Sequence, residues 1–586
     1  MPGIKAKAIH VGFVLAIAAI TLSPVPDATS SESLSAADNS AQGGPLTPGQ
    51  IDNLVLLGKV WGFAKYHHPD IAGGRIEWDA ELRRILPVVL GARGNVAGTA
   101  AISRWLAALN TSKCQSCAAM PDSAHLRPNI AWIRDSRTLG RELSASLVRI
   151  YDNRWSKSAQ HYVTFAPGVG NPVFANEKQY AEDSLPGSDL RLLALYRFWN
   201  IIEYWFPYRD LIEEDWDAVL REFVPRLWRS NDPDSYRLTM MMLIARVHDG
   251  HANLWSSLDV RPPRGLHRLP VKLRFIEGKL VVTGFMGDTL RQPAGLQVGD
   301  VITTIGGQRV DSLVNAWTPY YASSNQPARL RSIAQDLTKG PPGLVRVTGL
   351  RDDSALDLRL ERILIPTQEL RAQGVNALPG DAFQRLTKEV AYLKLGSVSA
   401  AQSAKYIQTA DSAKVLVIDI RTYPREFVVF ALGMHLVSQP TEFARFTYGD
   451  GTNPGAFLWT PPVSLQPAVP LFNGSIVILV DEGSQSQAEY TAMAFRAAPN
   501  SIVVGSTTAG ADGNVSPIVL PGGLRSMISG IGVFYPDKRP TQRIGIVPDL
   551  LVRPTIAGVR LGRDEVLEAG VSRALGREFR LRTVSK

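Results

Sequence analysis

The sequence predicts a multidomain α/β protein with duplicated N-terminal helical units, a β-rich middle segment and an α/β domain in its last third. Three observations support this fold class. A helical pattern occurs twice at an offset of 138 residues, strand-like alternation begins near residue 264, and apolar runs of strand length alternate with helical stretches from about residue 388. A chain of 586 residues has room for these domains.

Composition and charge place the chain among ordinary globular proteins. Hydrophobic residues make up 45% and charged residues 20% of the sequence, which is sufficient for packed cores. The net charge of +9 is spread along the chain without a long block of Lys or Arg. Nothing in this pattern indicates a nucleic-acid partner.

The first 28 residues have the order of a secretory signal peptide. Lys5 and Lys7 precede the apolar stretch VGFVLAIAAITL, and a small, polar segment follows it. The stretch is too short to cross a bilayer comfortably, although an uncleaved anchor stays open as the alternative. We therefore expect a signal peptide over residues 1–28 and a linker over 29–47. The mature protein should be exported, periplasmic or extracellular, without stable membrane insertion.

Residues 57–90 and 195–228 share one pattern without a gap. The matching pairs are Trp61 with Trp199, Tyr66 with Tyr204, Pro69 with Pro207, Trp78 with Trp216, Asp79 with Asp217, Leu82 with Leu220 and Pro87 with Pro225. Each copy indicates an aromatic-rich helix, a Pro-marked turn and a second amphipathic helix. Aromatic residues at helical spacing favour core packing over a ligand groove. We predict an N-terminal domain over 48–187, with the first helical unit and short strands, and a second helical unit over 188–260.

Cysteine and histidine pairs in the first half give little sign of a metal. Cys114 and Cys117 are the two cysteines of the chain, and in an exported protein they favour a local disulfide. A redox motif would need a βαβ context, and a zinc site would need a second ligand pair. His67 and His68 are adjacent, so on a helix their side chains point apart. We predict no metal site and no cofactor.

The segment over 264–365 is predicted to be rich in β-strands. The stretch QPAGLQVGDVITTIGGQRVDSL contains glycine-marked turns around a β-run. It resembles the bacterial PDZ domain, and the resemblance implies binding of extended peptides by strand addition. An ordinary turn-rich barrel without a ligand is the alternative.

Residues 385–575 show the α/β pattern. The apolar runs of strand length lie in EVAYLKLG, AKVLVIDIRTYP, GSIVILVDEGSQS and NSIVVGSTTAG. Near-continuous apolar strands indicate a sheet that is covered on both faces. Chemistry in such sheets lies at the carboxyl ends of the strands. Residues 419–421, 481–486 and 505–510 follow three of these runs and are expected to meet in one cleft.

Two serines lie between a predicted buried strand and a predicted helix in the stretch DEGSQSQAEYTAMAF. Ser486 and Glu489 fit the S-x-x-E capping box, in which each side chain bonds an amide at the helix start. The same turn also suits a nucleophile, because the helix amides can stabilise an oxyanion. Ser486 and Ser484 are therefore both candidates.

A serine nucleophile needs a base, and the histidines differ in context. His435 lies in an apolar helical stretch that is typical of a core histidine. His248 and His251 flank Asp-Gly at the end of the second helical unit, where a side chain can project into a cleft. A structural turn and a metal pair stay open as alternatives for these two residues.

Several motifs together resemble the S41 serine peptidases. The stretches RVHDGHANL, LVIDIRTYP, SQSQAEYTAMAF, VVGSTTAG and RIGIVPDL occur, with the PDZ-like segment, in the order found in that family. The family includes C-terminal processing proteases, the tricorn protease core and interphotoreceptor retinoid-binding proteins. The resemblance covers roughly residues 190–575 and implies a crotonase-like catalytic domain over 385–575.

The resemblance implies a serine peptidase, a hydrolase, that cleaves unstructured or C-terminal peptide segments of peptide or protein substrates. The alternative is a catalytically weak or inactive protein on the same scaffold that binds a peptide or an apolar ligand. An unrelated serine esterase is disfavoured, because G-x-S-x-G is absent around both serines.

The family motif assigns the nucleophile to Ser486, with Ser484 as the local alternative. Processing proteases use a Lys 25 residues after the nucleophile, but Ala511 stands there, and Lys538 does not fit the motif. The tricorn-like branch uses a histidine that corresponds to His251. The resemblance therefore implies His251 as the base.

The residues around the base depart from the family pattern. In the tricorn-like branch a Ser precedes the histidine and a Glu lies shortly before the G-V-x-P-D motif. Here these positions are Gly250 and Gln542. A glutamine can orient an imidazole but cannot stabilise its positive charge as a carboxylate does, so we expect modest activity.

The oxyanion loop also departs from the family pattern. The family sequence D-x-R-x-N-x-G-G corresponds to DIRTYPRE, in which Tyr423 replaces the Asn, and Arg425 and Glu426 replace the glycines. The resemblance implies backbone N–H donors at Arg425 and Gln487. Arg425 lacks the conformational freedom of glycine at this position.

Overall fold

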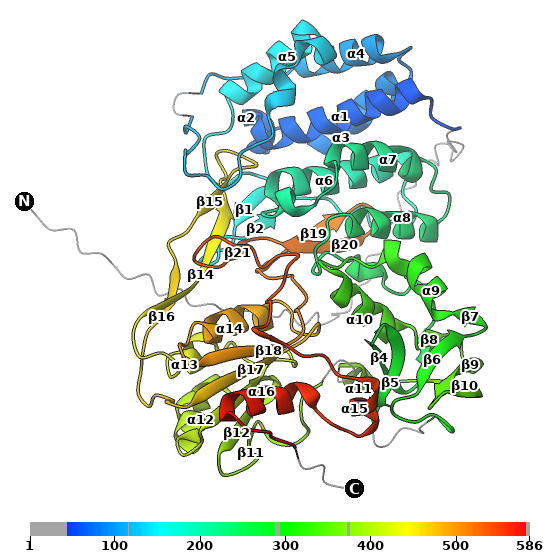
Figure 1. Ribbon diagram of the computed structural model, residues 1–586. Helices are drawn as coiled ribbons and strands as arrows, with labels where there is room; N and C mark the ends of the chain where they lie inside the picture. Colours follow the sequence, from blue (N-terminus) through cyan, green and yellow to red (C-terminus); the bar gives the residue numbers. More distant parts are fainter. Residues whose placement is uncertain (1–43, 115–116, 288–292, 372–375, 582–586) are drawn as a thin grey trace, which may run out of the picture.

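The computed structural model describes residues 44–114, 117–287, 293–371 and 376–581 (Figure 1). The predicted signal peptide and most of the predicted linker lie outside the described residues. Among the helices that are described, none is long and apolar enough to cross a bilayer. In Figure 1 the helical part lies above a β-rich domain and an α/β domain, which stand side by side.

Eight helices and a two-stranded sheet form the helical part that is described. In chain order they are α1 (Pro48–His67), α2 (Pro69–Ala72), α3 (Trp78–Leu90), α4 (Asn95–Ala107), α5 (Ser136–Asp152), β1 (Val163–Phe165), β2 (Pro172–Phe174), α6 (Ser188–Trp205), α7 (Trp216–Trp228) and α8 (Pro233–Ala245). Helix α8 starts where Asp232 accepts hydrogen bonds from the amides of Asp234 and Ser235, both at 2.9 Å. Such caps satisfy amides that have no partner inside the helix.

The helix pairs α1–α3 and α6–α7 share a reciprocal contact between tryptophans. The Trp61 indole donates to the Trp78 carbonyl at 3.3 Å, and the Trp78 indole donates to the Trp61 carbonyl at 2.9 Å. Trp199 and Trp216 exchange the same two bonds at 2.7 and 3.1 Å. Because a buried indole N–H needs an acceptor, these bonds hold each helix pair at equivalent points. The aromatic residues of both pairs lie in or against one helical core.

The β-rich domain occupies the middle of the chain. Its elements are β3 (His267–Arg268), β4 (Val271–Ile276), β5 (Lys279–Phe285), β6 (Val301–Ile305), β7 (Gln308–Arg309), α9 (Val310–Trp317), α10 (Gln326–Asp336), β8 (Lys339–Gly340), β9 (Gly343–Arg351) and β10 (Ser354–Leu364). The sheet has the order β4-β5-β6-β9-β10-β3-β8, with β7 beside β6. Helix α10 packs on β4 and faces the α/β domain.

The α/β domain follows. Its elements are α11 (Thr367–Arg371), β11 (Phe383–Arg385), β12 (Val390–Lys394), α12 (Ser403–Ala410), β13 (Val415–Asp419), α13 (Val429–Gly433), β14 (Thr441–Gly449), β15 (Phe457–Trp459), β16 (Val463–Leu465), β17 (Ser475–Val480), α14 (Gln487–Arg496), β18 (Ser501–Gly505), β19 (Val515–Leu520), β20 (Leu524–Ser529), β21 (Gly532–Phe534), β22 (Leu550–Leu551), α15 (Ile556–Arg560) and α16 (Glu565–Leu575).

The main sheet of this domain has the order β11-β12-β13-β17-β18-β22. All neighbours are parallel except β11 and β12. Residues of α12, α13 and α14 pack on one face, and residues of α16 pack on the other. The four predicted apolar runs form β12, β13, β17 and β18, and the predicted multidomain α/β architecture is confirmed.

One hairpin connects the α/β domain with the helical part. Strands β19 and β20 pair with each other and pack against α6 and β2. The Arg197 side chain donates to the Val519 carbonyl at 3.0 Å, and the Tyr236 hydroxyl donates to the Pro521 carbonyl at 2.8 Å. The hairpin places Ser529, at the end of β20, beside the turn that follows α8.

Candidate active site

Ser486 lies on a strained turn between β17 and α14. Its backbone has φ 57° and ψ −122°, a conformation that residues other than glycine rarely adopt. The Ser486 N–H donates to the Ala511 carbonyl at 2.9 Å and to Glu489 Oε2 at 3.1 Å. Strain of this kind costs about 1–3 kcal/mol and persists where the surroundings enforce it, often at functional sites.

Glu489 fixes this turn to the loop that follows β18. Its buried carboxylate accepts hydrogen bonds from the amides of Gly510 at 2.7 Å and Ala511 at 3.0 Å, besides that of Ser486. Burial raises the pKa of Glu489, although bonds from Thr508 and these amides oppose the shift. The glutamate of the predicted capping box thus organises two segments around Ser486.

Ser484 lies two residues before Ser486 but has a different environment. Its side chain is buried, and its hydroxyl donates to the Ile420 carbonyl at 2.9 Å. The same hydroxyl accepts from the Asp481 N–H at 3.2 Å. Ser484 therefore ties the ends of β13 and β17 together, and this geometry does not suit the alternative nucleophile.

His251 is held by a network of buried polar groups. Its Nδ1 atom is 2.9 Å from Ser529 Oγ and 3.6 Å from Asp249 Oδ1. The Ser529 hydroxyl donates to Asp249 Oδ1 at 3.1 Å, so it can accept the Nδ1 proton of His251. This arrangement leaves Nε2 as the unprotonated nitrogen of the neutral ring.

Asp249 is the carboxylate behind this histidine. It is fully buried, and it accepts from the Ser529 N–H at 2.7 Å and the His251 N–H at 3.0 Å. Burial alone would raise the pKa of Asp249, but the interactions with His251 and the amide of Ser529 outweigh burial and lower it. The carboxylate is therefore ionised at neutral pH.

The structure corrects the predicted role of Gln542. No bond joins Gln542 to His251 among the described contacts; its Nε2 atom is 3.4 Å from Asp249 Oδ1 and 3.4 Å from Ser324 Oγ. Gln542 thus supports Asp249, which in turn supports the imidazole. The expectation that no carboxylate stands behind His251 is wrong, since Asp249 fills this place two residues earlier in the chain.

Ser486 and His251 line the same cavity, which has a volume of about 380 Å³. Aromatic side chains from the loop before α13, from β14 and from α14 form its apolar wall, namely Phe427, Phe446 and Tyr490. Asp512 also lines it, and burial together with the nearby Glu489 raises the pKa of Asp512 well above its usual range. Both influences favour the protonated form of its side chain.

Of the two predicted oxyanion donors, the structure excludes one. The Arg425 N–H donates to the Leu395 carbonyl at 3.2 Å, so it is not free to meet a substrate oxygen. The Gln487 N–H belongs to the first residue of α14 and faces the hydroxyl of Tyr423. The sequence could not show this, because Leu395 lies 30 residues before Arg425 in the chain.

The remaining candidates lie away from the cavity. His248 Nε2 is 3.0 Å from Glu214 Oε1, and His435 Nδ1 is 2.8 Å from the Pro470 carbonyl. Lys538 is exposed and lies 5.2 Å from the centre of the Trp459 ring. Within the described ranges, no group of three or more His, Cys, Asp or Glu residues is arranged to hold a metal ion.

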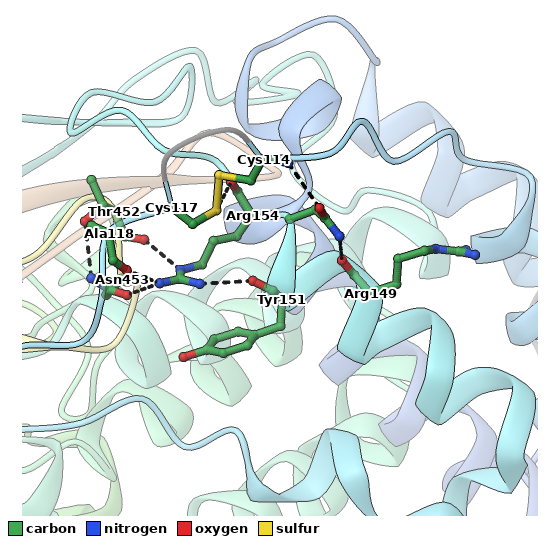
Figure 2. Close-up of a disulfide and its surroundings, with 9 residues drawn as sticks. Cys114, Cys117, Ala118, Arg149, Tyr151, Arg154, Thr452 and Asn453 are labelled. Atoms are coloured by element: carbon green, nitrogen blue, oxygen red, sulfur yellow. Dashed lines mark hydrogen bonds between the residues drawn. A yellow bond between two sulfur atoms is a disulfide. The ribbon is translucent and has the colours of Figure 1, made fainter.

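The two cysteines are bonded to each other. Cys114 and Cys117 form a disulfide beside Arg154, as Figure 2 shows. The Arg154 guanidinium donates to the carbonyls of Ala118 and Thr452 and to the Asn453 side chain. The disulfide loop thus adjoins a contact between the helical part and the loop that connects β14 with β15.

Comparison with known proteins identifies the α/β domain. Residues 389–552 match the model of peptidase family S41. The chain therefore carries an S41 peptidase domain, and the family resemblance that the sequence indicated is confirmed.

Solved structures of CPAF share the fold. Mature CPAF is 14% identical, with a TM-score of 0.50, and the match covers 64% of this chain and 94% of CPAF. A CPAF point mutant is 13% identical, with a TM-score of 0.53, and the match covers 67% of this chain and 99% of that one. The photosystem II D1 C-terminal processing protease is 16% identical over 66% of this chain and 97% of its own, with a TM-score of 0.38. No curated protein matches the chain.

Proposed function

We propose that the protein is an exported serine endopeptidase that cleaves unstructured or C-terminal peptide segments, with Ser486 as nucleophile and His251 as base. The observation that carries this proposal is the shared cavity, which Ser486 lines from a strained turn and His251 lines with Asp249 behind it. The family match of residues 389–552 supports the class of reaction.

The proposed mechanism follows from the direction of each hydrogen bond. Ser486 Oγ attacks the scissile carbonyl carbon, and His251 Nε2 takes the hydroxyl proton and later returns it to the leaving amine. Ser529 accepts the Nδ1 proton in a hydrogen bond and passes the interaction on to Asp249. The ionised Asp249 then stabilises the positive imidazolium that forms during attack.

The β-rich domain contributes to the same site. Arg331 of α10 lines the cavity, donates to the Glu482 carbonyl at 2.7 Å and donates to Gln485 at 3.1 Å. We propose that this PDZ-like domain also binds substrate peptides at its sheet edge and directs them toward Ser486. Titration of the intact Ser486→Ala protein with peptides that have free or amidated C-termini tests this role.

Export is the second part of the proposal and rests on the order of charged, apolar and small residues at the N-terminus. The mature chain should begin between about Ala28 and Ala41. N-terminal sequencing of protein from the periplasm or the medium checks this. A start at Met1 with tight membrane association would indicate an anchor.

Labelling with a serine-reactive fluorophosphonate, followed by mapping of the modified residue, tests the nucleophile. We expect the label on Ser486, no labelling or proteolysis by Ser486→Ala, and retained labelling by Ser484→Ala. Ser484 is the matched control, because it lies on the same turn but is buried and hydrogen-bonded. A label on another residue would overturn the assignment.

A second candidate function is a catalytically weak or inactive protein that binds peptides or apolar ligands in the same cavity. The observation that favours it is the loss of the Arg425 N–H as an oxyanion donor. A folded protein that takes no label and cleaves no unstructured substrate, yet binds peptides, would establish this alternative.

A further inference from the structure

The proposed attack by Ser486 creates a negative oxygen that needs hydrogen-bond donors. The Gln487 N–H is one donor, because it is the first amide of α14 and has no partner within the helix. One such donor contributes about 2.7–4 kcal/mol of transition-state stabilisation, and serine hydrolases generally use two. A second donor must come from another element at the cavity.

The neighbouring loop does not offer the donor predicted at Arg425, because it is fastened to the segment that follows β12. The Arg425 N–H donates to the Leu395 carbonyl at 3.2 Å. The Thr422 hydroxyl accepts from the Gly396 N–H at 2.8 Å, and Glu426 Oε2 accepts from the Ala400 N–H at 2.7 Å. These bonds hold the loop on both sides of Tyr423.

The side chain of Tyr423 projects from this fastened loop to the cavity that contains Ser486 and His251. Its hydroxyl interacts with the Ser486 hydroxyl and with the Gln487 N–H. The residue is 45% exposed, so its ring has room to shift when a substrate arrives. Tyr423 thus lies in the cavity beside both Ser486 and the Gln487 N–H.

We propose that the Tyr423 hydroxyl is the second oxyanion donor, in partnership with the Gln487 N–H. This inference rests on the proposed peptidase function. The Ser486 Oγ–carbon bond forms, the π pair of the carbonyl moves onto its oxygen, and the Ser486 proton moves to His251 Nε2. The oxygen accepts hydrogen bonds from the Gln487 N–H and from the Tyr423 O–H, and the tyrosine keeps its proton.

The electrostatics of the site agree with this role. Burial raises the pKa of Tyr423, although hydrogen bonding to Ser486 and Gln487 opposes the shift. The phenol therefore remains a protonated donor at neutral pH. Burial and the nearby Glu489 also raise the pKa of Asp512, in the same cavity, which favours the neutral form of this carboxyl group beside the oxyanion.

The test compares Tyr423→Phe with the wild type in steady-state proteolysis. We expect kcat to fall about 10²–10³-fold, the loss typical of a missing oxyanion donor, while KM changes less than about threefold. Affinity for a peptide boronic acid, which forms a tetrahedral adduct with serine, should fall in parallel with kcat. Affinity for a non-covalent peptide in the Ser486→Ala background should be unchanged by Tyr423→Phe.

Tyr448→Phe is the matched control, because Tyr448 is 38% exposed on β14 and does not line the cavity. It should retain wild-type kcat. If Tyr423→Phe retains full kcat while the wild type labels at Ser486, the inference is wrong and the proposed function stands. If Tyr423→Asn raises kcat, the tyrosine obstructs the site and the inference is also wrong. A wild type that neither labels nor cleaves would overturn the proposed function and the inference together.

Discussion

Two buried aspartates near the same cavity show how differently the same type of side chain ionises in two parts of the fold. Asp249, on the turn after α8, accepts bonds from two amides and the Ser529 hydroxyl and pairs with His251. Asp512, on the loop after β18, accepts one amide bond, from Gly513 at 2.8 Å, and its other oxygen has no hydrogen-bond partner among the described residues. The pKa of Asp249 is lowered, whereas the pKa of Asp512 is raised well above its usual range.

The contrast shows that burial does not decide ionisation by itself. Desolvation is the largest influence on both carboxyl groups and raises the pKa of each. The donors and the histidine around Asp249 reverse that effect, whereas the nearby Glu489 adds to it at Asp512. Pairs of titratable groups whose pKa values are shifted in opposite directions often have distinct roles in a site. Asp249 is suited to support a base, and Asp512 is suited to form a neutral wall.

The largest expected effect is on catalysis. Asp249→Asn removes the charge that stabilises the His251 imidazolium, so we expect kcat/KM for an unstructured protein substrate to fall about 10²–10⁴-fold. Asp512→Asn replaces a carboxyl group whose raised pKa favours the neutral form with a neutral amide of similar shape, and should change kcat/KM less than about threefold. Steady-state proteolysis of both purified variants measures the difference. Equal losses of kcat/KM in the two variants would contradict the different roles assigned to the two aspartates.

The next effect concerns stability and Asp512. In the unfolded chain this carboxyl group ionises above about pH 4, while in the folded protein it keeps its proton to a higher pH because its pKa is raised. Wild-type stability therefore decreases by about 1.4 kcal/mol per pH unit from this group until the pH reaches its folded pKa. Asp512→Asn lacks this loss, so its advantage in the free energy of urea unfolding should grow as the pH rises above about 4. A difference that does not change with pH would contradict the raised pKa.

Asp249 should show the opposite dependence. Its folded pKa is lowered, so its contribution to stability is present above the unfolded value, near pH 4, and is lost as the pH falls through the folded value. We expect Asp249→Asn to reduce the free energy of unfolding by about 2–3 kcal/mol at pH 7, and by less at pH 4. Urea titrations of both proteins at the two pH values provide the measurement. A larger loss at pH 4 than at pH 7 would show that Asp249 is not ionised.

Local patterns were sufficient to predict much of the fold and part of the site. The apolar runs identify the central strands because parallel strands that are covered on both faces must be apolar. The matched tryptophans identify two helix pairs that form the same reciprocal bonds. The S-x-x-E pattern singles out Ser486, since a glutamate at that spacing must serve the helix start.

The rest of the site depends on contacts between distant segments. Ser529 lies 278 positions from His251, and only the packing of the β19–β20 hairpin on the helical part brings them together. Tyr423 departs from the family loop in sequence, but its position beside the Gln487 N–H depends on the bond from the Arg425 N–H to the Leu395 carbonyl and on the bond from the Gly396 N–H to Thr422. Asp249 could have been found, because it precedes His251 by two residues and the backbone of a D-x-H turn favours their pairing.

The smallest expected effect distinguishes two possible supports of His251: an acid at position 542, as in the family pattern, and the hydrogen-bond network around Asp249 in this structure. By the family resemblance, Gln542→Glu would restore an acid behind the histidine and raise activity. In the structure Gln542 Nε2 is 3.4 Å from Asp249 Oδ1, so a glutamate would place two carboxyl groups side by side. Like charges at this distance disfavour joint ionisation, and one of the two groups would have to take up a proton. We therefore expect kcat to fall about tenfold at pH 7, because the shared proton lowers the negative charge on Asp249, with a smaller loss at higher pH, where the pair gives up that proton.

Gln542→Met is the matched control for this last change, since it keeps the length of the side chain and removes both polar atoms. It should lower kcat less than Gln542→Glu does, because it leaves the charge of Asp249 alone. Proteolysis rates of both variants from pH 6 to pH 9 measure the effect. If Gln542→Glu exceeded the wild type across this range, position 542 would be the acid that supports His251, and the role assigned to Asp249 would be wrong.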